Sequence, residues 1–268
     1  MTPVALTIAG SDPSGGAGIQ ADLKTFHQFG VYGEAAITLL TVQNTEGVAR
    51  VECVAASLVI EQVRAVIEDI PPQAAKTGAL GSLEIVEALA ALAAEFDFPL
   101  VVDPVLVGSD GSPLSSADAR EAIATRLLPR ASLVMPNLEE ATALTGIEVK
   151  NVGAMREAAA RLCAMGARAA LVKGGHLKGP ATDVLYAHGA WREFTAPRVE
   201  TRHTHGTGCT YSAAVTACLA RGSRLEDAVA QAKTFLTAAL RTAPGLGRGR
   251  GPLNHHVIPP GAPGSLTP

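Results

Sequence analysis

The sequence predicts an α/β protein in which a mostly parallel sheet is covered by helices on both faces. Short, nearly continuous apolar segments alternate with amphipathic helical segments from residue 4 to about residue 172. Such strands are buried on both sides, as in parallel sheets that lie between helices. The 268 residues are 47% hydrophobic and 18% charged, which suits a full core. No linker divides the chain, so we predict one domain over 1–255 and an irregular tail over 256–268.

The first predicted strand, Val4–Ala9, is followed by a glycine-rich loop over 10–18 and then by a helix. Ile19, Leu23 and Phe26 lie on one stripe of that helix, and Gly30 follows its end. Further strands are expected, in chain order, at 35–42, 47–54 (short and at an edge), 74–80, 99–105, 132–135 and from 169. The intervening helices are expected at 58–70, from Ser82 to about 96, after Ser115 and Ser116, after Pro136 and at 152–165.

The regular alternation ends near residue 176. Segments 183–187 and 192–196 predict a hairpin around His188 and Gly189. A loop at 205–210 then enters a helix of small residues, and 225–243 predicts the last long helix. The segment from 244 onward is rich in Gly and Pro and is expected to be irregular.

Charge and cysteine usage exclude several classes of function. The net charge is −3 and no basic run is visible, which disfavours nucleic acids and anionic membranes as partners. The N-terminal apolar run is too short for a signal peptide, and no apolar stretch is long enough to cross a bilayer. The cysteines form no C-x-x-C pair, which is typical of reduced thiols. We therefore expect a cytoplasmic protein that acts on small molecules.

The loop His205–Thr210 is the strongest local signal of chemistry. Its glycines, Gly206 and Gly208, let the backbone turn and let a ligand approach closely. The following helix start has free N–H groups and about half a positive charge, so a phosphate could bind there. Cys209 lies in this field, so its thiol is expected to have a lowered pKa. The alternative is a plain glycine-rich helix start.

Polar side chains follow several of the predicted strands. In open α/β sheets, ligands bind at the carboxyl ends of the strands. The loop at 10–18 matches neither the dinucleotide fingerprint nor the P-loop pattern, so those sites are not expected there. The polar residues at the strand ends predict one site at a single edge of the sheet: Asp12, Gln43, Lys76, Asp103, Asn137, Glu140, Lys173 and the 205–210 loop.

Three segments, Ala9–Phe26, Val172–His176 and His205–Thr210, together resemble one family. It is the hydroxymethylpyrimidine/phosphomethylpyrimidine kinases of thiamine biosynthesis, in the ribokinase-like superfamily. The similarity extends to about residue 255, and the first segment is the most specific. The other two are shared more loosely with pyridoxal kinases. Sugar kinases of the superfamily carry an aspartate where this chain has Cys209.

The resemblance implies a three-layer α/β/α fold, a homodimer, and two phosphoryl transfers from ATP with Mg²⁺. The first transfer goes to 4-amino-5-hydroxymethyl-2-methylpyrimidine and the second to its monophosphate, which gives the diphosphate. By the family pattern the pyrimidine pocket is lined by Gly10, Ala17, Asp22, Gln43 and Val105. The nucleotide and its phosphates are bound by Asn137, Lys173, Thr207, Gly208 and Lys233. The metal site contains Asp103 and Glu140, and the catalytic loop contains Gly206, Thr207, Gly208 and Cys209.

The chemistry of individual residues agrees with these roles. Asp103 and Glu140 could supply the oxygen ligands that Mg²⁺ prefers, although Glu140 could also be an exposed carboxylate at a helix start. Gln43 offers a donor and an acceptor side by side, which complements an aminopyrimidine edge. His205 is expected to orient its loop or to contact substrate. His255 and His256 are expected on the surface.

Two other functions remain open on the sequence. A pyridoxine or pyridoxal kinase, or a bifunctional enzyme, would use the same chemistry. A pyrimidine-sensing domain without catalysis would keep the fold. The joint presence of Asp103, Glu140, Lys173 and Cys209 disfavours the sensor, because a sensor does not need a metal site and an anion site.

Overall fold

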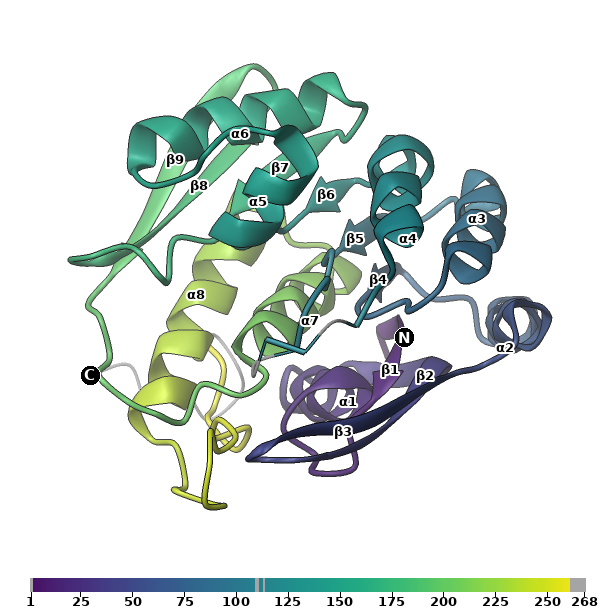
Figure 1. Cartoon of the computed structure of the whole chain (residues 1–268), viewed down its shortest axis with the longest axis horizontal. Coiled ribbons are helices and arrows are strands. Elements are labelled where there is room, and N and C mark those ends of the chain that lie inside the picture. Colours follow the sequence, from purple (N-terminus) through teal and green to yellow (C-terminus); the bar gives the residue numbers. More distant parts are fainter. Residues whose placement is uncertain (1, 109–110, 113, 261–268) are drawn as a thin grey trace.

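The computed structural model describes residues 2–108, 111–112 and 114–260. These residues form one sheet of nine strands in the order β3-β2-β1-β4-β5-β6-β7-β8-β9 (Figure 1). Strands β1, β2, β4, β5, β6 and β7 are parallel to one another, which confirms the predicted mostly parallel sheet. The strands are β1 Val4–Ser11, β2 Tyr32–Asn44, β3 Gly47–Cys53, β4 Ala74–Thr77, β5 Leu100–Val102, β6 Leu133–Val134, β7 Ala169–Val172, β8 Ala181–Ala187 and β9 Ala190–Ala196.

The antiparallel strands lie at the two edges of the sheet. At one edge β3 pairs with β2, and at the other β8 and β9 form the predicted hairpin. Its turn has positive φ at His188 (52°) and Gly189 (79°), as tight two-residue hairpin turns require. Several strand predictions were longer or shorter than the strands themselves. β2 begins at Tyr32 rather than 35, whereas β5 and β6 are only three and two residues long.

Helices cover both faces of the sheet, which confirms the three-layer architecture (Figure 1). One apolar core lies between the sheet and α2 to α6, and a second lies between the sheet and α1, α7 and α8. The helices are α1 Gly18–Gln28, α2 Ala56–Asp69, α3 Leu83–Leu92, α4 Ala117–Ala122, α5 Leu138–Thr145, α6 Val152–Ala164, α7 Thr207–Ala220 and α8 Leu225–Arg241. Short helical turns follow α3 (Ala93–Glu95) and α4 (Ile123–Leu127 and Leu128–Arg130).

Side-chain caps set the starts of α3, α4 and α5, and Asn151 caps α6 in the same way. Ser82 accepts the N–H of Ile85 at 3.4 Å, and Ser116 accepts that of Ala119 at 3.2 Å, as predicted for both serines. Asn137 and Glu140 form a reciprocal capping box at α5.

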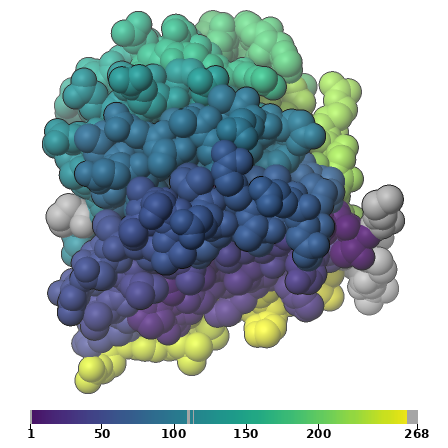
Figure 2. Space-filling model, turned by 90° about the vertical axis from the view of Figure 1, so that its right-hand side faces the viewer, coloured from purple at the N-terminus to yellow at the C-terminus, as the bar shows by residue number. Residues whose placement is uncertain are grey.

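Figure 2 looks onto the side of α2 and α3 and shows the chain as successive bands, purple below and teal above. None of the described helices is long and apolar enough to cross a membrane.

The chain returns to the second core after α8. His255 is buried, and its Nε2 lies 3.0 Å from Oγ1 of Thr210, so the prediction that it lies on the surface was wrong. The reason is that the segment after α8 packs back onto α7, with Leu253 in the core. Burial lowers the pKa of His255 to about 4. His256 is exposed, as predicted. Residues 256–260 carry neither helix nor strand, and 261–268 of the predicted tail lie outside the described residues.

A buried carboxyl group also lies in β2. Glu34, near the start of β2, is 6% exposed, and both of its carboxyl oxygens lack a hydrogen-bond partner among the described residues. Burial raises the pKa of Glu34 to about 7, and the charge of Asp69 adds to the shift. Between pH 4.5 and 7 the unfolded chain therefore loses this proton while the folded protein keeps it. The free energy of unfolding falls as pH rises through this window.

We expect Glu34→Gln to stabilise the protein at pH 8 but not at pH 4.5. The glutamine resembles the protonated acid and removes the cost of burying a charge, up to about 3 kcal/mol for such a shift. Thermal unfolding of both proteins from pH 4.5 to 8 measures the effect. A difference in Tm that stays constant over this range would contradict a titrating Glu34.

Candidate active site

The carboxyl ends of the parallel strands surround a cavity of about 730 Å³, a size typical of small-molecule sites. Because neighbouring parallel strands end at the same edge, they bring together residues that are far apart in sequence. The isolated pairing of Asn137 with Lys173 is one such contact. The cavity is lined by the predicted site residues Gly10, Ala17, Gln43, Asp103, Val105, Asn137, Glu140, Lys173, Gly206, Thr207, Gly208, Cys209 and Lys233.

Asp22 is the predicted site residue that does not line the cavity. Its side chain is fully buried, and its carboxylate accepts hydrogen bonds from Nζ of Lys76 at 2.8 and 2.9 Å and from Oγ1 of Thr7 at 2.6 Å. Lys76, expected at the strand-end site, is fully buried in the same pair. A carboxylate inside a core needs such partners, because an unpaired charge there is costly. The assignment of Asp22 to the pocket wall is therefore corrected: the Asp22–Lys76 pair lies in the core instead.

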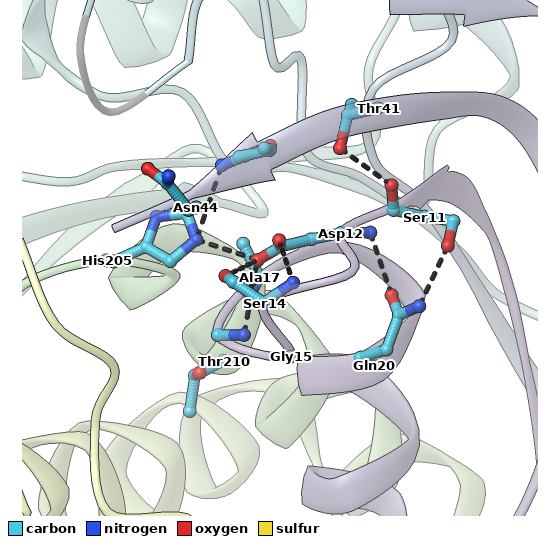
Figure 3. A network of polar contacts seen from close by, with 12 residues as sticks. Ser11, Asp12, Ser14, Gly15, Ala17, Gln20, Thr41, Asn44, His205 and Thr210 are labelled. Atoms are coloured by element: carbon cyan, nitrogen blue, oxygen red, sulfur yellow. Dashed lines mark hydrogen bonds and ion pairs between the residues drawn. The ribbon is translucent and has the colours of Figure 1, made fainter. Parts of the chain in front are cut away.

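Asp12 organises the glycine-rich loop on one side of the cavity (Figure 3). Its carboxylate accepts backbone N–H groups of Ser14, Gly16 and Ala17 at 2.8 to 3.2 Å, and the Ser14 hydroxyl at 2.9 Å. Its Oδ2 also lies 2.7 Å from Nε2 of His205, which belongs to the opposite loop. Burial alone would raise the pKa of Asp12, but the bonds from His205 and Ser14 lower it below the ordinary value.

The two loops that flank the cavity pack backbone against backbone. Gly206 has a φ of +80°, and a Cβ there would collide with the carbonyl oxygen of Gly16. A side chain on Gly16 would in turn meet the ring of His205. These contacts require glycine at both positions. The glycines of the two loops therefore allow the loops to approach each other closely as well as to turn.

The anion end of the cavity lies at the start of α7. Nζ of Lys173, just beyond β7, donates to Oδ1 of Asp103 at 2.7 Å, and the Ser212 hydroxyl donates to Oδ2 at 3.0 Å. A Cβ on Gly208 would lie 3.3 Å from Nζ of Lys173, so the helix start and the ammonium face the same space. Free helix N–H groups together with an ammonium can bind a phosphate. Ser212 is a contact that the sequence analysis missed, because a serine within a small-residue helix carries no distinctive signal.

Cys209 lies at this helix start, but its thiol is not acidic. Burial raises the pKa of Cys209 to about 11, and Lys76 opposes the shift only in part. The predicted lowering of its pKa was therefore wrong. The helix dipole stabilises the thiolate. Burial removes the water that would solvate it, and this destabilises the thiolate more strongly. The thiol stays protonated at neutral pH, so it is not available there to take a proton as a general base.

Glu140 and Asp103 are the residues predicted to hold a metal ion. Glu140 accepts the N–H of Asn137 at 2.8 Å and is 4% exposed, so it is a buried capping residue rather than an exposed one. Burial raises the pKa of Glu140 to about 7; Lys173 opposes this shift and Asp103 adds to it. Within the described ranges, no three His, Cys, Asp or Glu side chains gather as a metal site. Two carboxylates still fit Mg²⁺, which takes few protein ligands and binds substrate phosphates and water.

A further buried ion pair, between Lys233 and Asp183, also lines the cavity. Nζ of Lys233, on α8, donates to Oδ2 of Asp183 at 2.6 Å, and Oδ1 of Asp183 accepts the N–H of Gly174 at 2.9 Å. The ammonium also lies 5.9 Å from the ring centre of Tyr211. The sequence analysis missed Asp183 and Tyr211. An aspartate within an apolar hairpin strand was the available signal for Asp183.

Comparison with known proteins places the chain in a family. The phosphomethylpyrimidine kinase family matches residues 12–254. A hydroxymethylpyrimidine/phosphomethylpyrimidine kinase of Streptomyces coelicolor is 47% identical over 253 residues, which are 94% of each chain. A thiamine biosynthesis bifunctional protein of Geobacter sulfurreducens is 48% identical over 93% of this chain, and the chain spans about half of that longer protein (51%).

Solved structures with the same fold include two kinds of kinase. An ADP complex of Bacillus subtilis pyridoxal kinase is 38% identical, with a TM-score of 0.88 over 95% of this chain and 98% of that chain. A phosphomethylpyrimidine kinase from Clostridium difficile is 40% identical, with a TM-score of 0.79 over 89% of this chain and 99% of that chain.

Proposed function

This chain belongs to the phosphomethylpyrimidine kinase family, and we propose that it carries out two phosphoryl transfers from ATP in thiamine biosynthesis. The first acceptor is 4-amino-5-hydroxymethyl-2-methylpyrimidine and the second is its monophosphate. The observation that supports this best is that one cavity is lined both by Gln43, which can hydrogen-bond to a polar ring, and by Lys173 and Gly208, which can bind a phosphate. The acceptor group and the transferred phosphate can then meet within a single site.

The reaction needs positioning and charge more than covalent help. In the first transfer the alcohol oxygen forms a bond to the γ-phosphorus, the bond to the leaving oxygen of ADP breaks and ADP keeps its electron pair, and the proton of the alcohol passes to solvent water. In the second transfer a phosphate oxygen attacks in the same way and has no proton to lose. Lys173 and the N–H group of Gly208 would bind the transferred phosphoryl oxygens, with Thr207 beside them, whose own N–H donates to the carbonyl oxygen of Thr204 at 3.2 Å. Asp103 and Glu140 would hold Mg²⁺, which would offset the phosphate charge.

Cys209→Ala tests how the thiol contributes. Because burial raises the pKa of Cys209 to about 11, the thiol should not act as a base for the alcohol. We expect both transfers to slow by the same factor, within about threefold, since a lost base alone would cost about 10²–10⁴-fold on the alcohol step. Single-turnover rates with alcohol and with monophosphate measure this. A selective loss on the alcohol would restore the base role.

Pyridoxal phosphorylation is a second candidate, because pyridoxal kinases share this fold with TM-scores up to 0.88. ATP consumption with the pyrimidine alcohol, its monophosphate and pyridoxal, each at several concentrations, separates the candidates. We expect the highest kcat/KM with the pyrimidines. A protein that binds the pyrimidine but consumes no ATP would be the sensing domain instead.

We also propose a homodimer in the cytoplasm. The family resemblance supports the dimer, and so do Leu40, Val42 and Leu58, which keep half or more of their surface exposed on β2 and α2. The four free cysteines fit a reducing compartment. Sedimentation analysis of the purified protein tests the dimer.

A further inference from the structure

His205 joins the two loops of the cavity at one nitrogen atom. Its Nε2 lies 2.7 Å from Oδ2 of Asp12 (Figure 3). The same nitrogen lies 3.4 Å from the amide nitrogen, Nε2, of Gln43. His205 is 3% exposed and Asp12 is also 3% exposed, so water has little access to this contact. The position of the imidazole is therefore set by the protein rather than by solvent.

The ionisation state of Asp12 determines whether Nε2 of His205 carries a proton. Its carboxylate already accepts four hydrogen bonds from the glycine-rich loop. These donors and His205 lower the pKa of Asp12, so it is ionised at neutral pH and can only accept. Nε2 of His205 must then carry the proton and donate it.

A donating Nε2–H has a consequence for Gln43. The two ends of a side-chain amide have the same shape, and the hydrogen-bond network decides which end faces which neighbour. An N–H of the amide cannot bond to the N–H of His205, whereas the amide oxygen can accept it. The favourable arrangement turns Oε1 of Gln43 toward His205 and leaves the NH₂ group for the cavity that Gln43 lines.

We propose that His205 is a positioning residue that makes Gln43 read a hydrogen-bond acceptor on the substrate ring. The inference rests on the proposed function: the aminopyrimidine edge carries both an amino donor and a ring nitrogen acceptor. The NH₂ of Gln43 selects the ring nitrogen next to the amino-bearing carbon, and the amino group contributes less. Asp12 holds the orientation by keeping the proton on Nε2.

Three ligands distinguish the ring nitrogen of the pyrimidine from its amino group as the atom that Gln43 recognises. They are the parent pyrimidine, an analogue with C–H in place of that ring nitrogen, and an analogue without the amino group. Affinities are measured by calorimetry and kcat/KM is measured with ATP. For wild type we expect a loss of about 10- to 100-fold without the ring nitrogen, because a donor is left unpaired. We expect less than about fivefold without the amino group.

Variants of His205 test the positioning. His205→Leu removes the donor and lets the amide of Gln43 turn, so the loss caused by the missing ring nitrogen should fall below about fivefold. His205→Gln keeps an N–H for Asp12 and Gln43 and should restore much of the discrimination. His256→Leu, an exposed control, should behave as wild type. A merely structural role would instead weaken all three ligands by one common factor and leave their ratios unchanged.

The outcomes distinguish the inference from the proposed function. If wild type neither binds nor phosphorylates the parent pyrimidine, the proposed function fails and the inference fails with it. If wild type phosphorylates the parent but loses more without the amino group than without the ring nitrogen, only the orientation of Gln43 is overturned. Unchanged ratios in His205→Leu would likewise overturn the role of His205 alone.

Discussion

Lys76→Met should destabilise the protein by about 3–5 kcal/mol, because it leaves the carboxylate of Asp22 charged and buried without its partner. Both side chains are 0% exposed, and Nζ of Lys76 lies 2.8 Å from Oδ1 of Asp22. Burial alone would lower the pKa of Lys76, but the Asp22 carboxylate more than compensates and keeps it above the ordinary value. Urea unfolding at pH 7 measures the loss.

A double variant and a surface pair serve as controls for this prediction. Lys76→Met combined with Asp22→Leu removes both charges and should recover most of the stability, since buried pairs are often replaceable by apolar residues. Arg50→Met breaks a pair whose side chains are 70% and 64% exposed, and it should cost no more than about 1 kcal/mol. A loss below about 1 kcal/mol in Lys76→Met would show that Asp22 becomes protonated or rehydrated.

Lys173→Met should lower turnover about 10²–10³-fold, the usual loss for one group that stabilises a developing oxyanion charge. Its ammonium lies beside Gly208 at the start of α7, where the transferred phosphoryl group is proposed to bind. The apparent KM for the pyrimidine should change little, because Gln43 lies elsewhere in the cavity. Steady-state rates over a range of both substrates separate the two effects.

The control must account for Asp103, which loses its ion-pair partner in the same variant. Lys173→Arg keeps a positive charge beside Asp103 and should retain more turnover than Lys173→Met. Lys150→Met removes an exposed lysine and should leave both rate and stability unchanged. If Lys173→Met lost only thermal stability and kept its turnover, Lys173 would be a structural partner of Asp103 and not a phosphate ligand.

The sequence by itself determined the fold class and the edge at which the site lies. The apolar strands, the caps at Ser82 and Ser116 and the hairpin at His188 and Gly189 are encoded by neighbouring residues, so they could be predicted without contacts. The same holds for the glycine-rich loops, because a turn that needs positive φ selects glycine locally. Nearly all of the residues that the family motifs point to then line the cavity, although many of the other lining residues carry no such motif.

Only the tertiary structure decided which charged groups pair and which side chains lose water. Asp22 binds Lys76 across 54 positions, and Asp12 binds His205 across 193. No local pattern encodes such pairs, because they depend on which loops meet when the sheet closes. The thiol of Cys209 follows the same rule. The helix start that favours its ionisation is visible in the sequence. The burial that opposes ionisation depends on all the residues that pack around the thiol, and its effect on the pKa is the larger one.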